Sequence, residues 1–207
     1  MTGTLSGTPG AHPELDDPPA DPFGLLREWV AAAETAGIPD TLAAALATVG
    51  VDGAPSVRFV ALKEVTEAGV VFGTSTESPK GRDMSRDPRV ALAVYWRDTM
   101  QQVRLTGRAR PLDDEASDRL FHARVRAAQA ATIVSRQSEP LTSEPALAQQ
   151  AAELERGTEE LVRPAHWRAW LVTAQTVEFW VGSTGRLHRR LAYTRTADGW
   201  SARRLQP

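Results

Sequence analysis

The sequence predicts a mainly β protein, an antiparallel barrel with helices inserted between some of its strands. Short strand-like segments follow one another in consecutive pairs, and one pair flanks the turn sequence VDGA at residues 51–54. The helical segments interrupt this succession and do not alternate with single strands, which argues against a doubly wound parallel sheet. An antiparallel barrel decorated by helices satisfies both observations.

The chain begins with a segment that does not resemble a barrel strand or helix. Residues 1–20 are rich in Pro, Gly, Thr and Asp, and we interpret them as a disordered or extended N-terminal arm. The alternative is an arm that folds over a partner subunit or a site. This start has no basic segment followed by an apolar core, so we expect no signal peptide. Residues 21–207 form the predicted barrel domain.

The first elements of that domain are a helix and three strands. Residues 23–36 repeat apolar side chains at helical spacing, and Gly37 follows as a stop signal. Two strands are predicted at 41–50 and 55–65, because an Asp-Gly turn between alternating segments is typical of a hairpin. A third strand is predicted at 69–76.

A short helix follows and leads into a second pair of strands. Ser78 is a suitable N-cap, with Pro79 at the first helical position, and the helix is expected to end before Pro88. The two strands are predicted at 89–96 and 101–112.

The remaining elements include the most strongly helical segment of the chain. Residues 113–134 predict one helix, opened by acidic residues that suit the N-terminal end of the helix dipole. A polar loop and a second helix are expected at 135–145 and 146–157. The chain then returns to strands, predicted at 166–182, 185–196 and 200–207.

Composition excludes several classes of function. The chain has 42% hydrophobic and 24% charged residues, which is ordinary for a soluble globular protein, and its formal charge of −2 excludes a basic body that coats nucleic acid. It has no cysteine, so disulfides, thiolate metal sites and a cysteine nucleophile are excluded. That absence is compatible with the cytoplasm, where we expect the protein. No apolar run approaches the ~20 residues of a membrane helix, so no membrane partner is expected.

Common catalytic motifs are missing, and what remains is a set of cationic and amide side chains. The four histidines lack ligand spacing, so no metal is expected, and there is no GxSxG, Walker or GxGxxG sequence. Arg58 and Lys63 lie five residues apart on one predicted strand, hence on opposite faces. Lys80, beside hydroxyl side chains at a helix start, is compatible with a phosphate site or with an ordinary capped surface helix.

The segment RLHRRLAYTR at residues 186–195 carries four arginines and a histidine. A solvated surface strand carries such charge at no cost. A strand that delivers arginines to an anionic ligand has the same composition. From these residues alone both interpretations stay open. Alternation places Arg189 on the face opposite Arg186, His188 and Arg190, and we expect Arg189 and Arg195 to be solvated charges.

An ordered set of motifs resembles one known family. RFVALK, VVFGTSTESPKG, RQS, VEFW, RLHRRLAY and RRLQP stand in the order found in the pyridoxamine 5′-phosphate oxidase family, flavin-dependent split-barrel enzymes. The resemblance runs from DPFGLLREWV to the C-terminus. It implies an antiparallel FMN-binding split β-barrel, a homodimer with FMN at the subunit interface, and dioxygen as electron acceptor.

The resemblance also implies which residues bind ligands. The FMN contacts carried over are Arg58, Phe59, Val60, Ala61, Leu62, Lys63, Gly73, Thr74, Ser78, Lys80, Gln102, Gln137, Ser138, Trp180 and Arg190. The substrate contacts carried over are Lys63, Arg124, Arg186 and His188. No catalytic residue beyond the flavin is implied.

Several departures from the family pattern concern the substrate. Leu120 and Ala128 stand where the pyridoxal-phosphate enzymes carry a tyrosine and a serine that help to hold the substrate phosphate. Neither replacement can donate a hydrogen bond. Pro79 replaces an arginine of the usual SRK motif, and the usual WGG is WRA at residues 167–169.

Other segments resemble the phenazine-biosynthesis flavin oxidases more closely, among them EAGVVF, SPKGR, YWRDTMQQ and SRQSE. This branch implies an FMN-dependent oxidase of a reduced nitrogen heterocycle, a dihydro- or hexahydrophenazine carboxylate. Arg124 and Arg186 then meet a carboxylate in place of a phosphate. One alternative is a pyridoxamine/pyridoxine 5′-phosphate oxidase, which the retained Lys63 favours. A second alternative is a flavin-binding protein without oxidase turnover.

Overall fold

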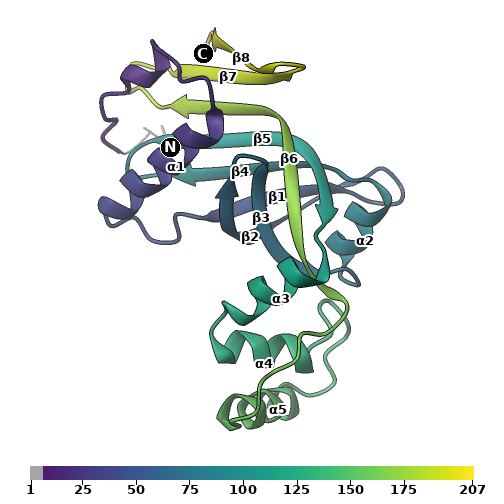
Figure 1. The fold of residues 1–207 in the computed structure, drawn as a ribbon. Coiled ribbons are helices and arrows are strands. Elements are labelled where there is room, and N and C mark those ends of the chain that lie inside the picture. Colours follow the sequence, from purple (N-terminus) through teal and green to yellow (C-terminus); the bar gives the residue numbers. More distant parts are fainter. Residues whose placement is uncertain (1–6) are drawn as a thin grey trace.

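The computed structural model describes residues 7–207, and its strands form one antiparallel sheet that closes on itself (Figure 1). The sheet runs β3-β2-β1-β4-β5-β6, and β3 pairs back onto β6 to close a six-stranded barrel. The last two strands extend the sheet beyond β6. The strands are β1 (Ala43–Val49), β2 (Pro55–Thr66), β3 (Gly69–Ser75), β4 (Arg89–Trp96), β5 (Gln101–Pro111), β6 (Trp167–Val181), β7 (Arg189–Thr196) and β8 (Gly199–Leu205). The barrel predicted from the sequence is therefore confirmed.

The barrel is filled by the inward side chains of alternating strands. The burial pattern of β5 alternates strictly over most of its length, as expected when one face of a strand packs on a core. Helix α1 (Pro22–Thr35) packs against this core through Phe23 and Trp29, and the Trp29 ring meets Phe179 edge-on at 5.0 Å. Asp21 caps the helix by accepting from the N–H groups of Phe23 and Gly24.

The barrel is split between two of its strands. β2 pairs with β3 only from Leu62 to Thr66, whereas β3 pairs with β6 along its other edge from Val70 to Ser75. Residues 55–61 of β2 therefore pair with β1 alone and keep a free edge. The N–H of Leu62 donates to the carbonyl of Leu42 on the β1 side. Backbone groups alternate in direction along a strand, so those of Phe59 and Ala61 point the other way, to the free edge.

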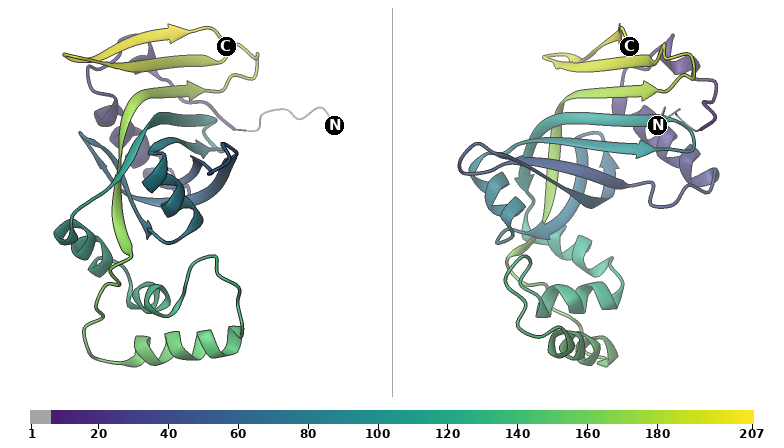
Figure 2. Two further views of the ribbon diagram at one scale, coloured as in Figure 1. Left: turned by 90° about the vertical axis from the view of Figure 1, so that its right-hand side faces the viewer. Right: turned by 180° about the vertical axis from the view of Figure 1, so that it is seen from behind.

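Three helices between β5 and β6 form an arm that projects from the barrel (Figures 1 and 2). We call residues 113–166 the helical arm. It consists of α3 (Asp114–His122), α4 (Arg126–Val134) and α5 (Glu144–Arg156). The helix α2 (Pro79–Arg86) lies elsewhere, between β3 and β4.

The single helix predicted at residues 113–134 is wrong, because the chain breaks at Ala123–Val125 into α3 and α4. The Gln129 side chain donates to the carbonyls of His122 and Arg124, which thus lose no partner when the helix stops. No Gly or Pro marks this break. The break is instead stabilised by this side-chain contact across the turn.

The N-terminal arm is extended over the residues that the structure describes, 7–20, apart from one 3₁₀ turn at Pro13–Leu15. Asp16 accepts from Arg189 and Arg204 at 2.7 Å each, and the Tyr193 hydroxyl donates to the carbonyl of Pro19. The first six residues of the predicted arm lie outside the described part.

Two arginines expected to be solvated have partners. Arg189 is ion-paired with Asp16, and Arg195 donates to the carbonyl of Ala174 while it stacks on the Trp200 ring at 4.3 Å. Both contacts involve residues distant in sequence, which alternation along a single strand cannot reveal. Among residues 7–207, no helix is long and apolar enough to cross a membrane.

Candidate functional site

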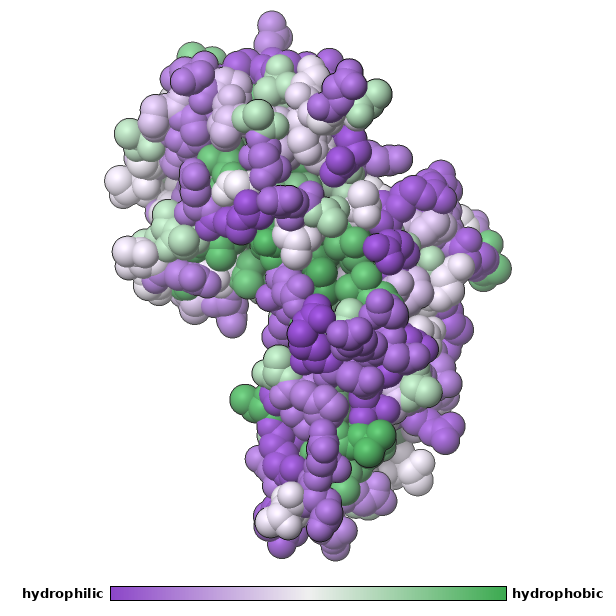
Figure 3. Space-filling view, viewed as in Figure 1, coloured by the Kyte–Doolittle hydropathy of each residue, from purple (hydrophilic) through white to green (hydrophobic). Residues whose placement is uncertain are grey.

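A cavity of about 1210 Å³ lies between the split of the barrel and the helical arm. Its walls come from β2, β3, the start of α2, the α3–α4 turn and the loop that follows α4. The space-filling view shows the outline of the molecule hollowed where the helical arm leaves the barrel (Figure 3). The volume exceeds the ~300–1,000 Å³ of a pocket for one small ligand.

One end of the cavity is cationic. Lys80 donates from its Nζ to Gln137 Oε1 at 3.0 Å, and Thr74 donates to the same oxygen at 3.3 Å. Arg58 is held beside them by hydrogen bonds to Thr48 and to the carbonyl of Leu46.

These two cations are desolvated. Burial, with a smaller contribution from the charge of Arg58, lowers the pKa of Lys80 to about 8. Burial also lowers the pKa of Arg58, although the carboxylate of Asp83 opposes the shift. Two like charges that destabilise each other at the wall of a cavity are arranged to meet an anion.

Helix α2 adds its N-terminus to this end. Ser78 is a fully buried N-cap that accepts from the N–H of Gly81 and donates to the carbonyl of Ser75, which ties the helix to β3. The next two residues, Pro79 and Lys80, line the cavity. The predicted cap is confirmed, and the positive end of the helix dipole points to the site of the two cations.

The other end of the cavity is apolar around one guanidinium group. Leu120 and Ala128 line it, and Arg124 lies between them, donating to the Thr132 hydroxyl at 2.7 Å. The guanidinium carbon is 5.1 Å from the Trp167 ring centre. Burial lowers the pKa of Arg124.

The structure brings most of the predicted site residues to this one cavity. Arg58 and Lys63 both line it, although alternation predicted opposite faces, because the pairing is irregular between Leu62 and Glu64 and the neighbouring edge of β2 is free. Leu62 and Ser78 are buried behind the wall. The predicted residues that line the cavity are Arg58, Phe59, Val60, Ala61, Lys63, Gly73, Thr74, Lys80, Gln137, Ser138 and Arg124.

A second group of predicted residues does not line the cavity and gathers on the outer face of the sheet. Gln102, Trp180 and Arg190 are cross-strand neighbours on β5, β6 and β7. Arg190 donates to the buried carboxylate of Glu178 at 2.8 Å, and Arg104 donates to its other oxygen at 2.6 Å. Burial alone raises the pKa of Glu178, but these two hydrogen bonds outweigh it and lower the value.

The loop before β7 holds the last two predicted residues. β7 begins at Arg189, so the strand predicted from residue 185 starts later and alternation does not reach Arg186. Arg186 has a φ of +67° in the turn, and the His188 ring lies 4.8 Å from the Trp180 ring. His188 Nδ1 accepts from the N–H of Ser183.

Several residues that line the cavity received no role from the sequence, among them Trp167, Thr132 and His166. Trp167 was noted only as part of an altered motif. A Cβ on Gly73 would lie 2.2 Å from the Trp167 ring, but this close contact between residues distant in sequence is visible only in the structure. Thr132 carried no sequence signal, because its partner Arg124 becomes a neighbour only after the helix breaks.

Comparison with known protein families covers nearly the whole chain. Residues 31–170 match the family model for pyridoxamine 5′-phosphate oxidase. Residues 167–207 match the model for the pyridoxine 5′-phosphate oxidase C-terminal dimerisation region. The second group of predicted site residues falls mostly in this dimerisation region.

Curated relatives carry two different activities in their names. A dihydrophenazinedicarboxylate synthase of Pseudomonas chlororaphis is 39% identical over 208 residues, covering 100% of this chain and 94% of that protein. A pyridoxine/pyridoxamine 5′-phosphate oxidase of Burkholderia lata is 42% identical over 191 residues, covering 90% of this chain and 89% of that protein. Sequence identity therefore does not separate the two activities.

Solved structures share the fold. PhzG from Burkholderia lata 383, in complex with tetrahydrophenazine-1-carboxylic acid, superposes with a TM-score of 0.93 at 37% identity, covering 98% of this chain and 100% of that one. A pyridoxamine 5′-phosphate oxidase-related, FMN-binding protein of Nostoc punctiforme has a TM-score of 0.75 at 18% identity, covering 90% and 98%. The second likeness concerns the fold alone, and both confirm the split barrel.

Proposed function

This chain belongs to the pyridoxamine 5′-phosphate oxidase family, and on that premise we propose that it is an FMN-dependent oxidase of a reduced, carboxylated phenazine precursor. The observation that carries the proposal is the contrast between the two ends of the cavity. One end offers two cations and a helix N-terminus, which suit a phosphate. The other offers one guanidinium in apolar surroundings, which suits a flat ring with a carboxylate.

The cationic end fits the phosphate of FMN. Lys80 and Arg58 are both partly desolvated. A bound dianion offsets the free-energy cost of burying these two charges. Thr74 and Gln137 add neutral polar groups at hydrogen-bond distance of one another. The loss of an arginine at Pro79 leaves this pair of cations in place.

The free edge of β2 fits the flavin ring. The backbone N–H and C=O groups of Phe59 and Ala61 point to the split, and both residues line the cavity. A planar heterocycle with alternating donors and acceptors along one edge can pair with such a strand edge. The middle of the segment from Arg58 to Lys63 would then contact the flavin through its backbone, and only Arg58 and Lys63 would contribute charged side chains.

The apolar end favours the phenazine precursor as substrate. A phosphate monoester carries up to two charges and needs several donors, whereas Leu120 and Ala128 supply none. One guanidinium can hold a carboxylate by two parallel hydrogen bonds. The names of PhzG and of the Pseudomonas chlororaphis relative agree with this choice.

The second group of predicted residues is assigned to the other subunit's cavity. Gln102, Trp180 and Arg190 lie on an outer face, where they cannot reach the cavity of their own chain through the barrel. The match of residues 167–207 to a dimerisation region supports a homodimer. In such a dimer each flavin lies in the seam, and Arg186 and His188 close the substrate end.

In this mechanism the protein places and holds the reactants. FMN, held by Lys80, Arg58 and the free edge of β2, would supply the redox chemistry, a two-electron oxidation of the substrate with dioxygen as acceptor and hydrogen peroxide as product. Arg124 fixes the carboxylate and thereby the carbon that faces the flavin, while Leu120 and Ala128 exclude water. Because the product gains aromaticity, correct placement is the main contribution that the chain must make.

The direct test compares two substrates on the purified FMN-loaded protein. We expect oxygen consumption with tetrahydrophenazine-1-carboxylic acid and a kcat/KM at least ~100-fold lower with pyridoxine 5′-phosphate, because two neutral donors to the phosphate are missing. Comparable turnover of pyridoxine phosphate would contradict the proposal. A yellow protein that neither compound reduces without oxygen would indicate a flavin-binding role without turnover.

The second candidate function is pyridoxamine/pyridoxine 5′-phosphate oxidase activity. Lys63 lines the cavity, as that activity requires by resemblance, and the Burkholderia lata relative of that name is as similar as the synthase. The double variant Leu120→Tyr with Ala128→Ser tests this alternative. If the missing hydrogen-bond donors at positions 120 and 128 are what prevents the wild type from using pyridoxine phosphate, we expect the double variant to gain turnover of this compound.

A further inference from the structure

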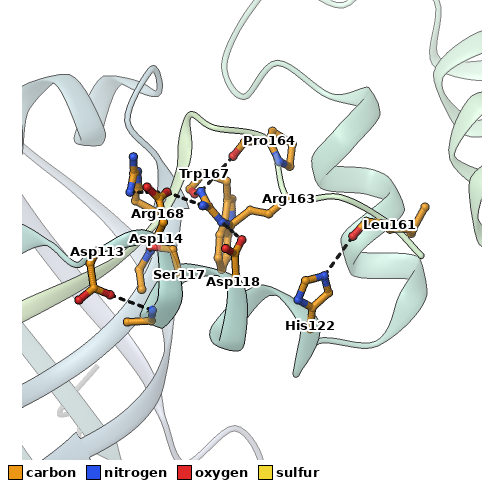
Figure 4. A network of polar contacts seen from close by, with 12 residues as sticks. Asp113, Asp114, Ser117, Asp118, His122, Leu161, Arg163, Pro164, Trp167 and Arg168 are labelled. Atoms are coloured by element: carbon orange, nitrogen blue, oxygen red, sulfur yellow. Dashed lines mark hydrogen bonds and ion pairs between the residues drawn. The ribbon is translucent and has the colours of Figure 1, made fainter. Parts of the chain in front are cut away.

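An ion cluster around one buried arginine joins the helical arm to the barrel (Figure 4). We call Arg163, Arg168, Asp114 and Asp118 the Arg163 cluster. Arg163 donates to Asp118 and to Asp114 at 2.6 Å each, and Arg168 pairs with the same oxygen of Asp114 at 2.8 Å. The Arg163 side chain is only 6% exposed, so its charge depends on these carboxylates.

The same guanidinium forms a hydrogen bond with the first residue of β6. Arg163 Nη1 donates to the carbonyl of Trp167 at 2.7 Å. Nearby, the N–H of Ala169 donates to the buried hydroxyl of Ser117 on α3. The cluster therefore fixes α3 and the start of β6 relative to each other.

Trp167 transmits this position to the cavity. Its indole lies against the backbone at Gly73 on the barrel side, where a Cβ would come within 2.2 Å. On the other side Arg124 lies over the ring, and Phe121 meets it edge-on at 5.5 Å. The indole therefore contacts both β3, at Gly73, and the helical arm, at Arg124.

We propose that Arg163 is a positioning residue for the substrate, which sets the direction of the Arg124 guanidinium through Trp167. The inference rests on the proposed function, in which Arg124 holds the substrate carboxylate. Arg168 belongs to the cluster because it is ion-paired with Asp114, and it stands where the usual WGG motif has glycine. The consequence of this departure from the motif is that Asp114 pairs with two cations, Arg163 and Arg168.

The test is a double-mutant cycle between Arg163→Gln and Arg124→Gln in the FMN-loaded protein. For Arg163→Gln we expect KM for tetrahydrophenazine-1-carboxylic acid to rise about tenfold, with kcat and FMN affinity within about twofold of wild type. In the Arg124→Gln background the same change has no further effect on KM. An equal rise of KM in both backgrounds overturns the proposal.

Arg126→Gln is the matched control. Arg126 is another arginine of the helical arm, and it donates to the carbonyls of Leu154, Glu155 and Glu159 at the end of α5. It contacts neither Trp167 nor Arg124 in these interactions. We expect a lower melting temperature with KM unchanged, and a KM rise equal to that of Arg163→Gln would show a general effect of loosening the arm.

Two further variants keep the test decisive if Arg163→Gln does not fold. Arg168→Gln removes one cation from Asp114 and is expected to raise KM about threefold. Gly73→Ala displaces Trp167 from the barrel side and is expected to raise KM about tenfold, again only when Arg124 is present. Unchanged KM in both folded variants contradicts the proposal.

A second probe separates this inference from the proposed function. If the wild type oxidises only pyridoxine 5′-phosphate, the proposed substrate is wrong and the cycle is measured with that compound. Coupling between positions 163 and 124 then still supports the positioning role, because either anion meets Arg124. Absence of coupling with the compound that is turned over overturns it.

Discussion

Lys80 gives the site a pH dependence. Its pKa of about 8, lowered chiefly by burial, means that half of the ammonium form is lost at pH 8 and most of it by pH 9. A bound phosphate raises that pKa, so binding above pH 8 takes up a proton. We therefore expect the FMN dissociation constant to rise by up to about tenfold per pH unit above pH 8, measured by quenching of flavin fluorescence.

Lys80→Arg is the control for this titration. A guanidinium remains charged throughout this range, so we expect the variant to bind FMN with little change between pH 7.5 and pH 9.5. The same loss of affinity in Lys80→Arg would assign the pH dependence to another group.

We expect Arg190 and Arg186 to serve different ligands, Arg190 the flavin and Arg186 the substrate. Arg190 is fixed by Glu178 and by the carbonyl of Gln206, so we expect Arg190→Ala to weaken FMN binding by about 10–100-fold. Arg186 lies in the exposed turn, and Arg186→Ala is expected to raise the substrate KM while the flavin survives dialysis. The reverse outcome would show that the assignment of the two arginines is wrong.

Among the elements, α2 depends most on its cap. Ser78→Ala removes a buried hydroxyl that bridges α2 and β3, and we expect a loss of ~2 kcal/mol, at the upper end for N-caps. This corresponds to a melting temperature lower by about 4–8 °C. Ser143→Ala removes the exposed cap of α5 and is expected to cost less than half as much. Equal losses in a thermal melt would contradict the importance of the bridge.

The elements that the sequence predicted well are those with local signals. Ser78 and Pro79 mark the start of α2, and the strand at 89–96 has the bounds predicted for it. The break between α3 and α4 has no Gly or Pro to mark it. It is stabilised by hydrogen bonds from the Gln129 side chain, which the sequence pattern does not indicate. For the same reason the irregular pairing near Lys63 could not be predicted from period-two alternation.

For the whole molecule, ordered motifs predicted the family, and the cavity brings together most residues that they named. What the sequence could not reveal is the division into two groups, since the outer position of Trp180 and Arg190 depends on how the sheet closes. The position of Trp167 between Gly73 and Arg124 could not be predicted either, because these two residues are distant from each other in sequence.

The outer face of the barrel supports the proposal that the second group completes the cavity of another subunit. Val57 and Phe59 on β2 are 70% and 76% exposed, and Tyr95 on β4 is 48% exposed. The outward cross-strand neighbours that follow Phe59 are Ala45 on β1 and Ala93 on β4, and Arg104 on β5 comes next. This surface continues through β5 to Trp180 and Arg190 on the same sheet. Apolar surface of this kind is typical of an interface.

Ala45→Glu tests the interface at its centre, where Ala45 pairs with Phe59 and Ala93. We expect wild type to sediment at twice the chain mass of 22.5 kDa and the variant at that mass, because an unpaired charge in an apolar interface is costly. The variant should also lose FMN, since each cavity then lacks the partner's residues. Ala148→Glu on the exposed side of α5 is the matched control and should stay dimeric and yellow. A monomeric variant that keeps its flavin would show that one chain forms the complete cofactor site.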